Sequence, residues 1–162
     1  MMQCVAAEVL DRLKDRNARL VLAESCTGGL VAATLASIPG ASAALCGSLV
    51  TYTNAAKMDW LGVPKSLIEL HTEVSSEVAA AMVRGAVEKT PDATVAASIT
   101  GHLGPNVPAD LDGRGFIATR IGSETRVHDF QLKSKRRDAR QQEAAETVLL
   151  RLMEHLAASM AD

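Results

Sequence analysis

Residues 21–35 read VLAESCTGGLVAATL, and this stretch decides the fold class. An apolar run stops at a small polar cluster, Ser25-Cys26-Thr27-Gly28-Gly29, and a helix-forming run follows at once. The pattern predicts a buried strand, a tight turn and a helix. The first N–H groups of a helix lack partners within the helix and carry partial positive charge. The turn could therefore simply cap a helix, or it could present Ser25 as a nucleophile and hold an anion.

The rest of the chain continues this alternation and then closes with a hairpin. Helices are expected over 3–16, 29–37, 64–70, from Ser75 onward and over 138–159, and strands over 19–24, 48–53, 94–100, 114–121 and 125–132. Such an order is typical of a three-layer α/β/α domain with a mixed, mostly parallel sheet. The length predicts one domain over residues 1–162.

Composition and charge argue against several classes of protein. Lys and Arg number 17 against 19 Asp and Glu, so the net charge of −2 provides no field that would attract nucleic acid or an anionic membrane. No apolar run approaches the ~18 residues of a membrane span, and no basic leader precedes the first helix. Cys4, Cys26 and Cys46 lack CxxC spacing, which favours a reducing compartment. We therefore expect a cytoplasmic protein, and leave open whether it forms a homo-oligomer.

Polar residues end three of the predicted strands, at Glu24-Ser25, at Tyr52-Thr53-Asn54 and at Thr100-Gly101-His102. In open α/β sheets, ligands bind beyond the carboxyl ends of strands, so these segments could meet in one crevice. A serine is inert until a base activates it. None of the four histidines shows triad or metal-ligand spacing, whereas Lys57 follows Tyr52 by five residues and could accept the proton.

Plainer interpretations of the same residues stay open. Ser25 or Thr27 could be an ordinary helix cap, and Lys57 could be a solvated surface lysine. Tyr52 could be a half-buried strand residue, and Cys26 a small core residue. Spacing alone does not establish an enzyme.

Four segments together resemble a known family. They are LAESCTGGL (22–30), SLVTYTNAAKMDWLGVP (48–64), EVSSEVAAAMVRGA (73–86) and ASITGHLGP (97–105), and the chain is similar to the CinA C-terminal domain family over about residues 5–155. The resemblance implies a three-layer α/β/α fold and hydrolysis of the carboxamide of nicotinamide mononucleotide, with no metal or organic cofactor.

The resemblance also implies roles for particular residues. Ser25 would be the nucleophile, Lys57 its base, and Tyr52 a proton donor to the leaving ammonia. The backbone near Ser25 and the Thr100-Gly101 turn would hold the oxyanion. The substrate-binding residues expected in this way are Thr27, Gly28, Gly29, Asn54, Thr100, Gly101, His102, Arg137 and Arg140.

One loop departs from the family pattern. The family continues its third strand as TGIAGPGGG, whereas residues 100–115 here read TGHLGPNVPADLDGRG. Asp110 and Asp112 would repel a nucleotide phosphate if they lay beside it. His102 could contact the ligand, act as a general acid, or be a loop histidine held by a hydrogen bond. A different amide substrate for the same Ser-Tyr-Lys site is therefore an alternative.

A basic segment, LKSKRRDAR at 132–140, precedes and enters the last predicted helix. Cations at a helix N-terminus oppose the helix dipole, and a bound anion would relieve this. Arg136, Arg137 or Arg140 could thus reach a phosphate, although a solvated charged face is the alternative. No aromatic residue interleaves the segment, which argues against nucleic acid. The expected partner is a small nucleotide, bound either as a substrate or by a module without turnover.

Overall fold

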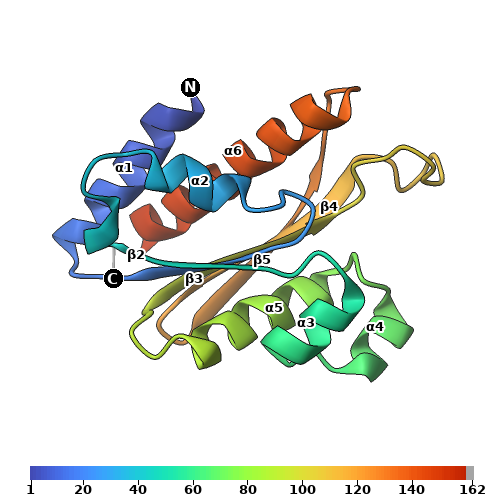
Figure 1. Ribbon diagram of the computed structural model, residues 1–162, viewed down its shortest axis with the longest axis horizontal. Coiled ribbons are helices and arrows are strands. Elements are labelled where there is room, and N and C mark those ends of the chain that lie inside the picture. Colours follow the sequence, from blue (N-terminus) through green and yellow to red (C-terminus); the bar gives the residue numbers. More distant parts are fainter. Residues whose placement is uncertain (160–162) are drawn as a thin grey trace.

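A five-stranded mixed sheet forms the centre of the computed structural model, which describes residues 1–159 (Figure 1). The strand order is β2-β1-β3-β4-β5, with β1 parallel to β2 and β3, and β4 antiparallel to β3 and β5. The strands span Leu45–Val50 (β2), Leu20–Glu24 (β1), Val95–Gly101 (β3), Arg114–Ile121 (β4) and Glu124–Gln131 (β5). The predicted mixed sheet with a closing hairpin is confirmed.

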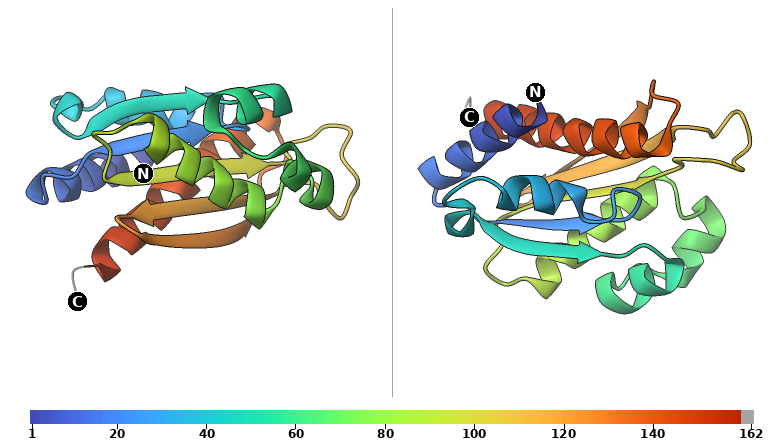
Figure 2. Two further views of the ribbon diagram at one scale, coloured as in Figure 1. Left: turned by 90° about the horizontal axis from the view of Figure 1, so that it is seen from below. Right: turned by 45° about the horizontal axis from the view of Figure 1, so that its top comes forward.

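Helices cover both faces of the sheet and complete the three predicted layers. On one face lie α1 (Met2–Asp15), α2 (Leu30–Ala36) and α6 (Arg137–Ala158), and on the other lie α3 (Asn54–Leu61), α4 (Lys65–His71) and α5 (Ser76–Lys89) (Figures 1 and 2). A short 3₁₀ turn, Ala41–Ala43, precedes β2. Within residues 1–159 no helix combines the length and apolarity needed to cross a bilayer.

The alternation of side chains along β1 divides the core into two halves. Leu20 and Leu22 pack under α1, α2 and α6, while Val21 and Ala23 pack against α5 and the end of α3. Successive strand residues point to opposite faces, so Glu24 faces the α2 side of the sheet. Ser25, which begins the following turn, reaches α3 on the other side.

The sequence prediction for β2 and α3 was wrong in its boundaries. The expected strand 48–53 lies instead at Leu45–Val50, and the helix Asn54–Leu61 was missed. Thr53 caps this helix by accepting a hydrogen bond from the Ala56 N–H at 3.1 Å. The β-branched and aromatic side chains of Thr51, Tyr52 and Thr53 suggested a strand, but the Thr53 cap outweighs this preference. The correction matters because α3 carries Lys57.

A glycine lets α5 lie directly against α3. A Cβ atom at Gly85 would stand only 1.9 Å from the carbonyl oxygen of Leu61, so no larger residue fits without moving one of the helices. This close contact positions α3 over the end of β1.

Candidate active site

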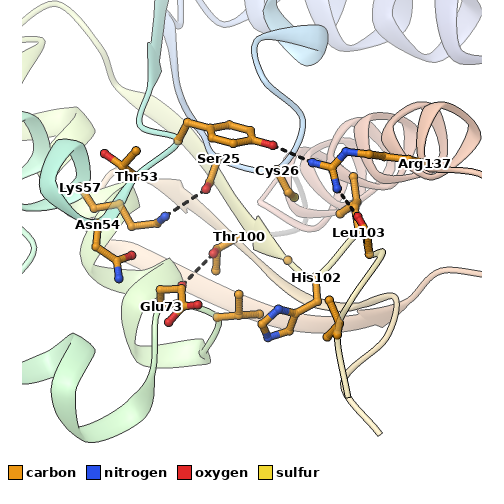
Figure 3. Close-up of a pocket in the computed structure, with 15 residues that line it drawn as sticks. Ser25, Cys26, Thr53, Asn54, Lys57, Glu73, Thr100, His102, Leu103 and Arg137 are labelled. Carbon is orange, nitrogen blue, oxygen red and sulfur yellow. Dashed lines mark hydrogen bonds between the residues drawn. The ribbon is translucent and has the colours of Figure 1, made fainter. Parts of the chain in front are cut away.

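A cavity of about 350 Å³ lies where the carboxyl ends of β1 and β3 meet the start of α3 (Figure 3). The three strand-end segments converge there, as the sequence suggested. Its lining residues are Ser25, Cys26, Tyr52, Thr53, Asn54, Lys57, Glu73, Val74, Thr100, Gly101, His102, Leu103, Gly104, Val107 and Arg137. Of the predicted site residues, the structure brings eight to this wall: Ser25, Tyr52, Asn54, Lys57, Thr100, Gly101, His102 and Arg137.

Ser25 and Lys57 form a hydrogen-bonded pair in the wall of the cavity. Lys57 Nζ donates to Ser25 Oγ at 3.0 Å, and Lys57 is only 2% exposed. Lys57 is therefore not a solvated surface lysine. Ser25 is not the cap of α2 either, because α2 begins at Leu30 after the N-cap residue Gly29.

The electrostatic surroundings of Lys57 favour a neutral amine. Burial lowers the pKa of Lys57 below its ordinary value, while the charge of Glu73 opposes this by raising the pKa. A neutral amine in hydrogen-bonding contact with a hydroxyl is the arrangement that a general base requires.

The neighbouring Cys26 thiol is a less suitable nucleophile. Cys26 is buried, and this burial raises the pKa of its thiol to about 12, so at neutral pH it is a thiol and not a thiolate. Within residues 1–159 its backbone N–H donates to no other residue, and it acts on the residue's own thiol by lowering its pKa slightly against the effect of burial. This N–H follows Ser25 directly in the chain.

The N-terminus of α2 binds an anion, but that anion is the chain's own Glu24. The Glu24 carboxylate is 1% exposed and accepts hydrogen bonds at 2.8–3.1 Å from five donors: Thr27 Oγ1, Gly29 N, Val31 N, Ala32 N and Ser48 Oγ. The carboxylate thus satisfies the orphan N–H groups and the dipole of the helix.

This arrangement leaves one group of predicted substrate contacts outside the cavity. Thr27 and Gly29 donate to Glu24, while the N–H of Gly28 donates to the carbonyl of Ser25, and none of the three lines the cavity. Gly28 and Gly29 have φ values of 62° and 97°, a backbone conformation that favours glycine. Their role in this structure is to form the turn around the Glu24 carboxylate.

Arg137 connects the start of α6 to the cavity. Its Nη2 donates to Tyr52 Oη at 2.6 Å, and its Nη1 donates to the carbonyl of Gly104. Tyr52 is 55% exposed, so it stands at the rim and not as a half-buried strand residue. The phenol and the guanidinium together form one side of the cavity mouth.

Arg140 does not line this cavity, and its role as a substrate-binding residue stays a prediction. It is 5% exposed, and its guanidinium donates to the two carboxylate oxygens of Asp112 at 2.6 and 2.7 Å and to the carbonyls of Leu103 and Ser134. The hydrogen bonds from Arg140 hold the pKa of Asp112 below its ordinary value. Arg140 therefore fixes the loop, and neutralises the acid expected to repel a phosphate.

A second hollow of about 430 Å³ adjoins the first beside this ion pair. Leu103, Gly104, Val107 and Arg137 line both hollows, and Lys135 adds a further cation to the second one. An anionic group of a ligand bound in the first hollow could extend into the second.

Sequence reasoning missed Glu73. It lies in the loop between α4 and α5, lines the cavity, and is held there by a 2.8 Å hydrogen bond from Thr100 Oγ1 to its backbone carbonyl. The available signal was its position at the start of EVSSEVAAAMVRGA, just before the cap residue Ser75. Its proximity to Lys57 depends on how α3 and α5 pack.

Known proteins resemble the chain in both sequence and structure. The family model described as the CinA C-terminal domain matches residues 2–156. A CinA-like protein of Myxococcus xanthus (strain DK1622) is 37% identical over 98% of this chain, and one of Anaeromyxobacter sp. (strain K) is 42% identical over 89%. The chain spans 38% and 36% of these two proteins, so they are considerably longer.

Two solved structures superpose closely on this fold. The competence/damage inducible protein CihA from Agrobacterium tumefaciens has a TM-score of 0.90 at 30% identity, covering 94% of each chain. A CinA superfamily protein from Klebsiella pneumoniae has a TM-score of 0.92 at 26% identity, covering 98% of this chain and 99% of the other. With a family match over nearly its whole length, the chain belongs to the CinA C-terminal domain family.

Proposed function

We propose that the chain is an amidohydrolase that converts the carboxamide of nicotinamide mononucleotide to the carboxylate, with release of ammonia. The observation that carries the proposal is the hydrogen bond between the buried Lys57 amine and Ser25 Oγ in a ligand-sized cavity. The choice of nicotinamide mononucleotide rests on the resemblance to the family.

In the first step, Ser25 Oγ attacks the carbonyl carbon of the amide while neutral Lys57 takes the hydroxyl proton. The carbonyl π electrons move to oxygen and form a tetrahedral oxyanion. The backbone N–H of Cys26 would donate to that oxyanion, as the backbone beside a nucleophile does in other acyl-transfer sites.

In the second step, the C–N bond breaks and the nitrogen leaves as ammonia after receiving a proton. Lys57 returns the proton it took, and the Tyr52 phenol, hydrogen-bonded to Arg137, assists at the rim. Water then hydrolyses the ester on Ser25, with Lys57 again as base, and the free carboxylate departs. No step requires a metal or an organic cofactor.

The cationic side of the site suits the phosphate of such a nucleotide. Arg137 borders both hollows and Lys135 lines the second, so a phosphate there would meet positive charge. Asn54, Thr100, Gly101 and His102 then contact the pyridine and ribose portions in the first hollow.

The deciding experiment compares ammonia release from nicotinamide mononucleotide by the wild type and by Ser25→Ala. We expect release by the wild type and at least a ~10³-fold loss in the variant, because the nucleophile is gone. Ser66→Ala, an exposed serine on α4, is the matched control and should retain full activity. Equal activity in wild type and Ser25→Ala would refute the mechanism.

A second candidate function uses the same residues on a different amide. It is favoured by the 101–113 loop, which differs from the family pattern and supplies His102, Leu103, Gly104 and Val107 to the wall. Labelling of Ser25 by a serine-directed acylating probe, without turnover of nicotinamide mononucleotide, would support this candidate. Nucleotide-induced thermal stabilisation without product or labelling would point instead to a binding module.

A further inference from the structure

Glu73 contributes the negative charge of the cavity. It is the single carboxylate among the residues described as lining the hollow, and the Cys26 thiol there is protonated at neutral pH. Figure 3 shows Glu73 and Lys57 on facing sides of this space, with Asn54 beside them. None of the ion pairs found within residues 1–159 includes Lys57, so the Glu73 carboxylate acts on the Lys57 amine across the cavity and not through a direct salt bridge.

The backbone holds Glu73 firmly in this place. The preceding residue, Thr72, has φ 67° and ψ 166°, a conformation that β-branched residues rarely adopt. Two hydrogen bonds hold Thr72 in this conformation. Its N–H donates to the carbonyl of Ile68, and its carbonyl accepts from Ser75 Oγ. Backbone strain that neighbouring contacts maintain is typical of functional positions, where a side chain must be held in one direction.

The charged and titratable groups that face Lys57 come from every element around it. They are Cys26 from the turn after β1, Tyr52 from the segment between β2 and α3, Glu73 from the α4–α5 loop, His102 from the loop after β3 and Arg137 from α6. Burial lowers the pKa of Lys57, and the charges of Glu73 and, less strongly, Cys26 raise it. Because the Cys26 thiol keeps its proton at neutral pH, Glu73 is the group here whose negative charge favours a protonated Lys57.

We propose that Glu73 is a positioning residue of the site, which acts on the reaction by setting how readily the Lys57 amine holds its proton. A general base is most effective when its proton affinity matches the working pH. A buried amine without Glu73 would be neutral over a wide range but would be a weak base. Glu73 restores basicity while leaving the amine free to bond Ser25. Only the second of the two tests below rests on the proposed function.

The first test follows the charge of Lys57 without any substrate. The pH dependence of the Lys57 Cε chemical shift is measured by NMR, with the resonance assigned by its loss in Lys57→Met. In Glu73→Gln the midpoint should move to lower pH by roughly one unit. Glu73→Asp, which keeps the charge, should stay near the wild type. Glu69→Gln, which removes an exposed acid of α4, is the matched control and should not shift the midpoint.

The second test is the pH profile of kcat/KM for ammonia release. In Glu73→Gln the midpoint of the acid limb of this profile should move to lower pH by the same amount. The plateau value of kcat/KM should fall several-fold, because Lys57 is then a weaker base. An unchanged Lys57 midpoint in a folded Glu73→Gln protein would overturn the proposal. A shifted midpoint in a protein that releases no ammonia from nicotinamide mononucleotide would support Glu73 and refute the proposed function alone.

Discussion

The burial of the Lys57 amine lowers the stability of the fold. A buried amine loses hydration whether it is charged or neutral, and here one hydroxyl, Ser25 Oγ, compensates for part of that loss. A core selected for stability alone would place an apolar side chain at this point of α3. Such a residue indicates a chemical role, in the way that strongly perturbed groups cluster at functional sites.

Lys57→Met separates the two effects at this position. Methionine has a similar length, so we expect it to fill the site and to raise the free energy of unfolding by roughly 1 kcal/mol. Ammonia release should fall at least ~10³-fold, because the base is lost. Thermal melting and the ammonia assay check the two outcomes. Lys65→Met, at an exposed lysine of α4, should change neither, and a destabilised Lys57→Met protein would contradict the argument.

The strand β1, its turn and helix α2 act as one element because Glu24 joins them. Its carboxylate lies at the end of the strand and accepts from three N–H groups of the helix start. The same carboxylate accepts from Ser48 of β2, so the cap also fastens the edge strand. Since Ser25 follows Glu24 directly, the position of Ser25 depends on this cap.

Glu24→Gln should weaken the element. The amide loses the charge that the helix start favours, and its NH₂ group would face other donors, so we expect a loss of about 3 kcal/mol in the free energy of unfolding. Urea denaturation measures the change. Glu8→Gln, on the exposed face of α1, provides the matched comparison and should cost well under 1 kcal/mol. A loss of equal size in both variants would show that Glu24 is not a special cap.

Most elements could be predicted from local pattern, and the exceptions have a physical reason. The strand 19–24 and the hairpin around Gly122 follow from continuous apolar or alternating runs, which encode their own burial. Helix α3 has little amphipathic pattern, because one of its two buried residues, Lys57, is a lysine. The buried lysine thus weakened the pattern that would have predicted this helix.

At the level of the whole molecule, α6 brings distant parts of the chain together. Its first residue, Arg137, reaches the cavity, while near its other end His155 lies fully buried against the sheet. His155 Nδ1 hydrogen-bonds with Thr119 Oγ1 at 2.8 Å, and Glu124, Arg126 and His128 are the charged or titratable groups that act on it from β5. Burial, followed by the charge of Arg126, lowers the pKa of His155 below its ordinary value of 6.5.

This lowered pKa gives the fold a dependence on pH. In the unfolded chain His155 binds a proton below about pH 6.5, whereas in the folded protein it stays neutral to lower pH. The contribution of His155 to the free energy of unfolding is therefore fully present above about pH 6.5, and it is lost as the pH falls below that value. Urea midpoints at pH 7.5 and 5.5 should differ more for the wild type than for His155→Gln. His71→Gln, at a histidine of α4 on the opposite face of the sheet, should keep the wild-type difference, and the same difference between the two pH values in all three proteins would contradict this explanation.

Part of the candidate site could be predicted from the sequence. Ser25, Tyr52 and Lys57 stand at strand ends or close behind them, where open α/β sheets bind ligands, and short-range pattern is enough to find such positions. The α/β class, the layers and the closing hairpin follow in the same way from periodicity along the chain. These features depend on residues that are only a few positions apart in the chain, so they can be predicted from the sequence.

Other features depended on packing between distant segments. That the Glu24 carboxylate occupies the start of α2, that Arg140 binds Asp112, and that Glu73 lines the same cavity as Lys57 were all decided by tertiary structure. In each case several partners of suitable charge were available along the chain. Only the folded arrangement of strands and helices determines which of them lies within reach, because hydrogen bonds and ion pairs act over a few ångströms in space regardless of separation in sequence.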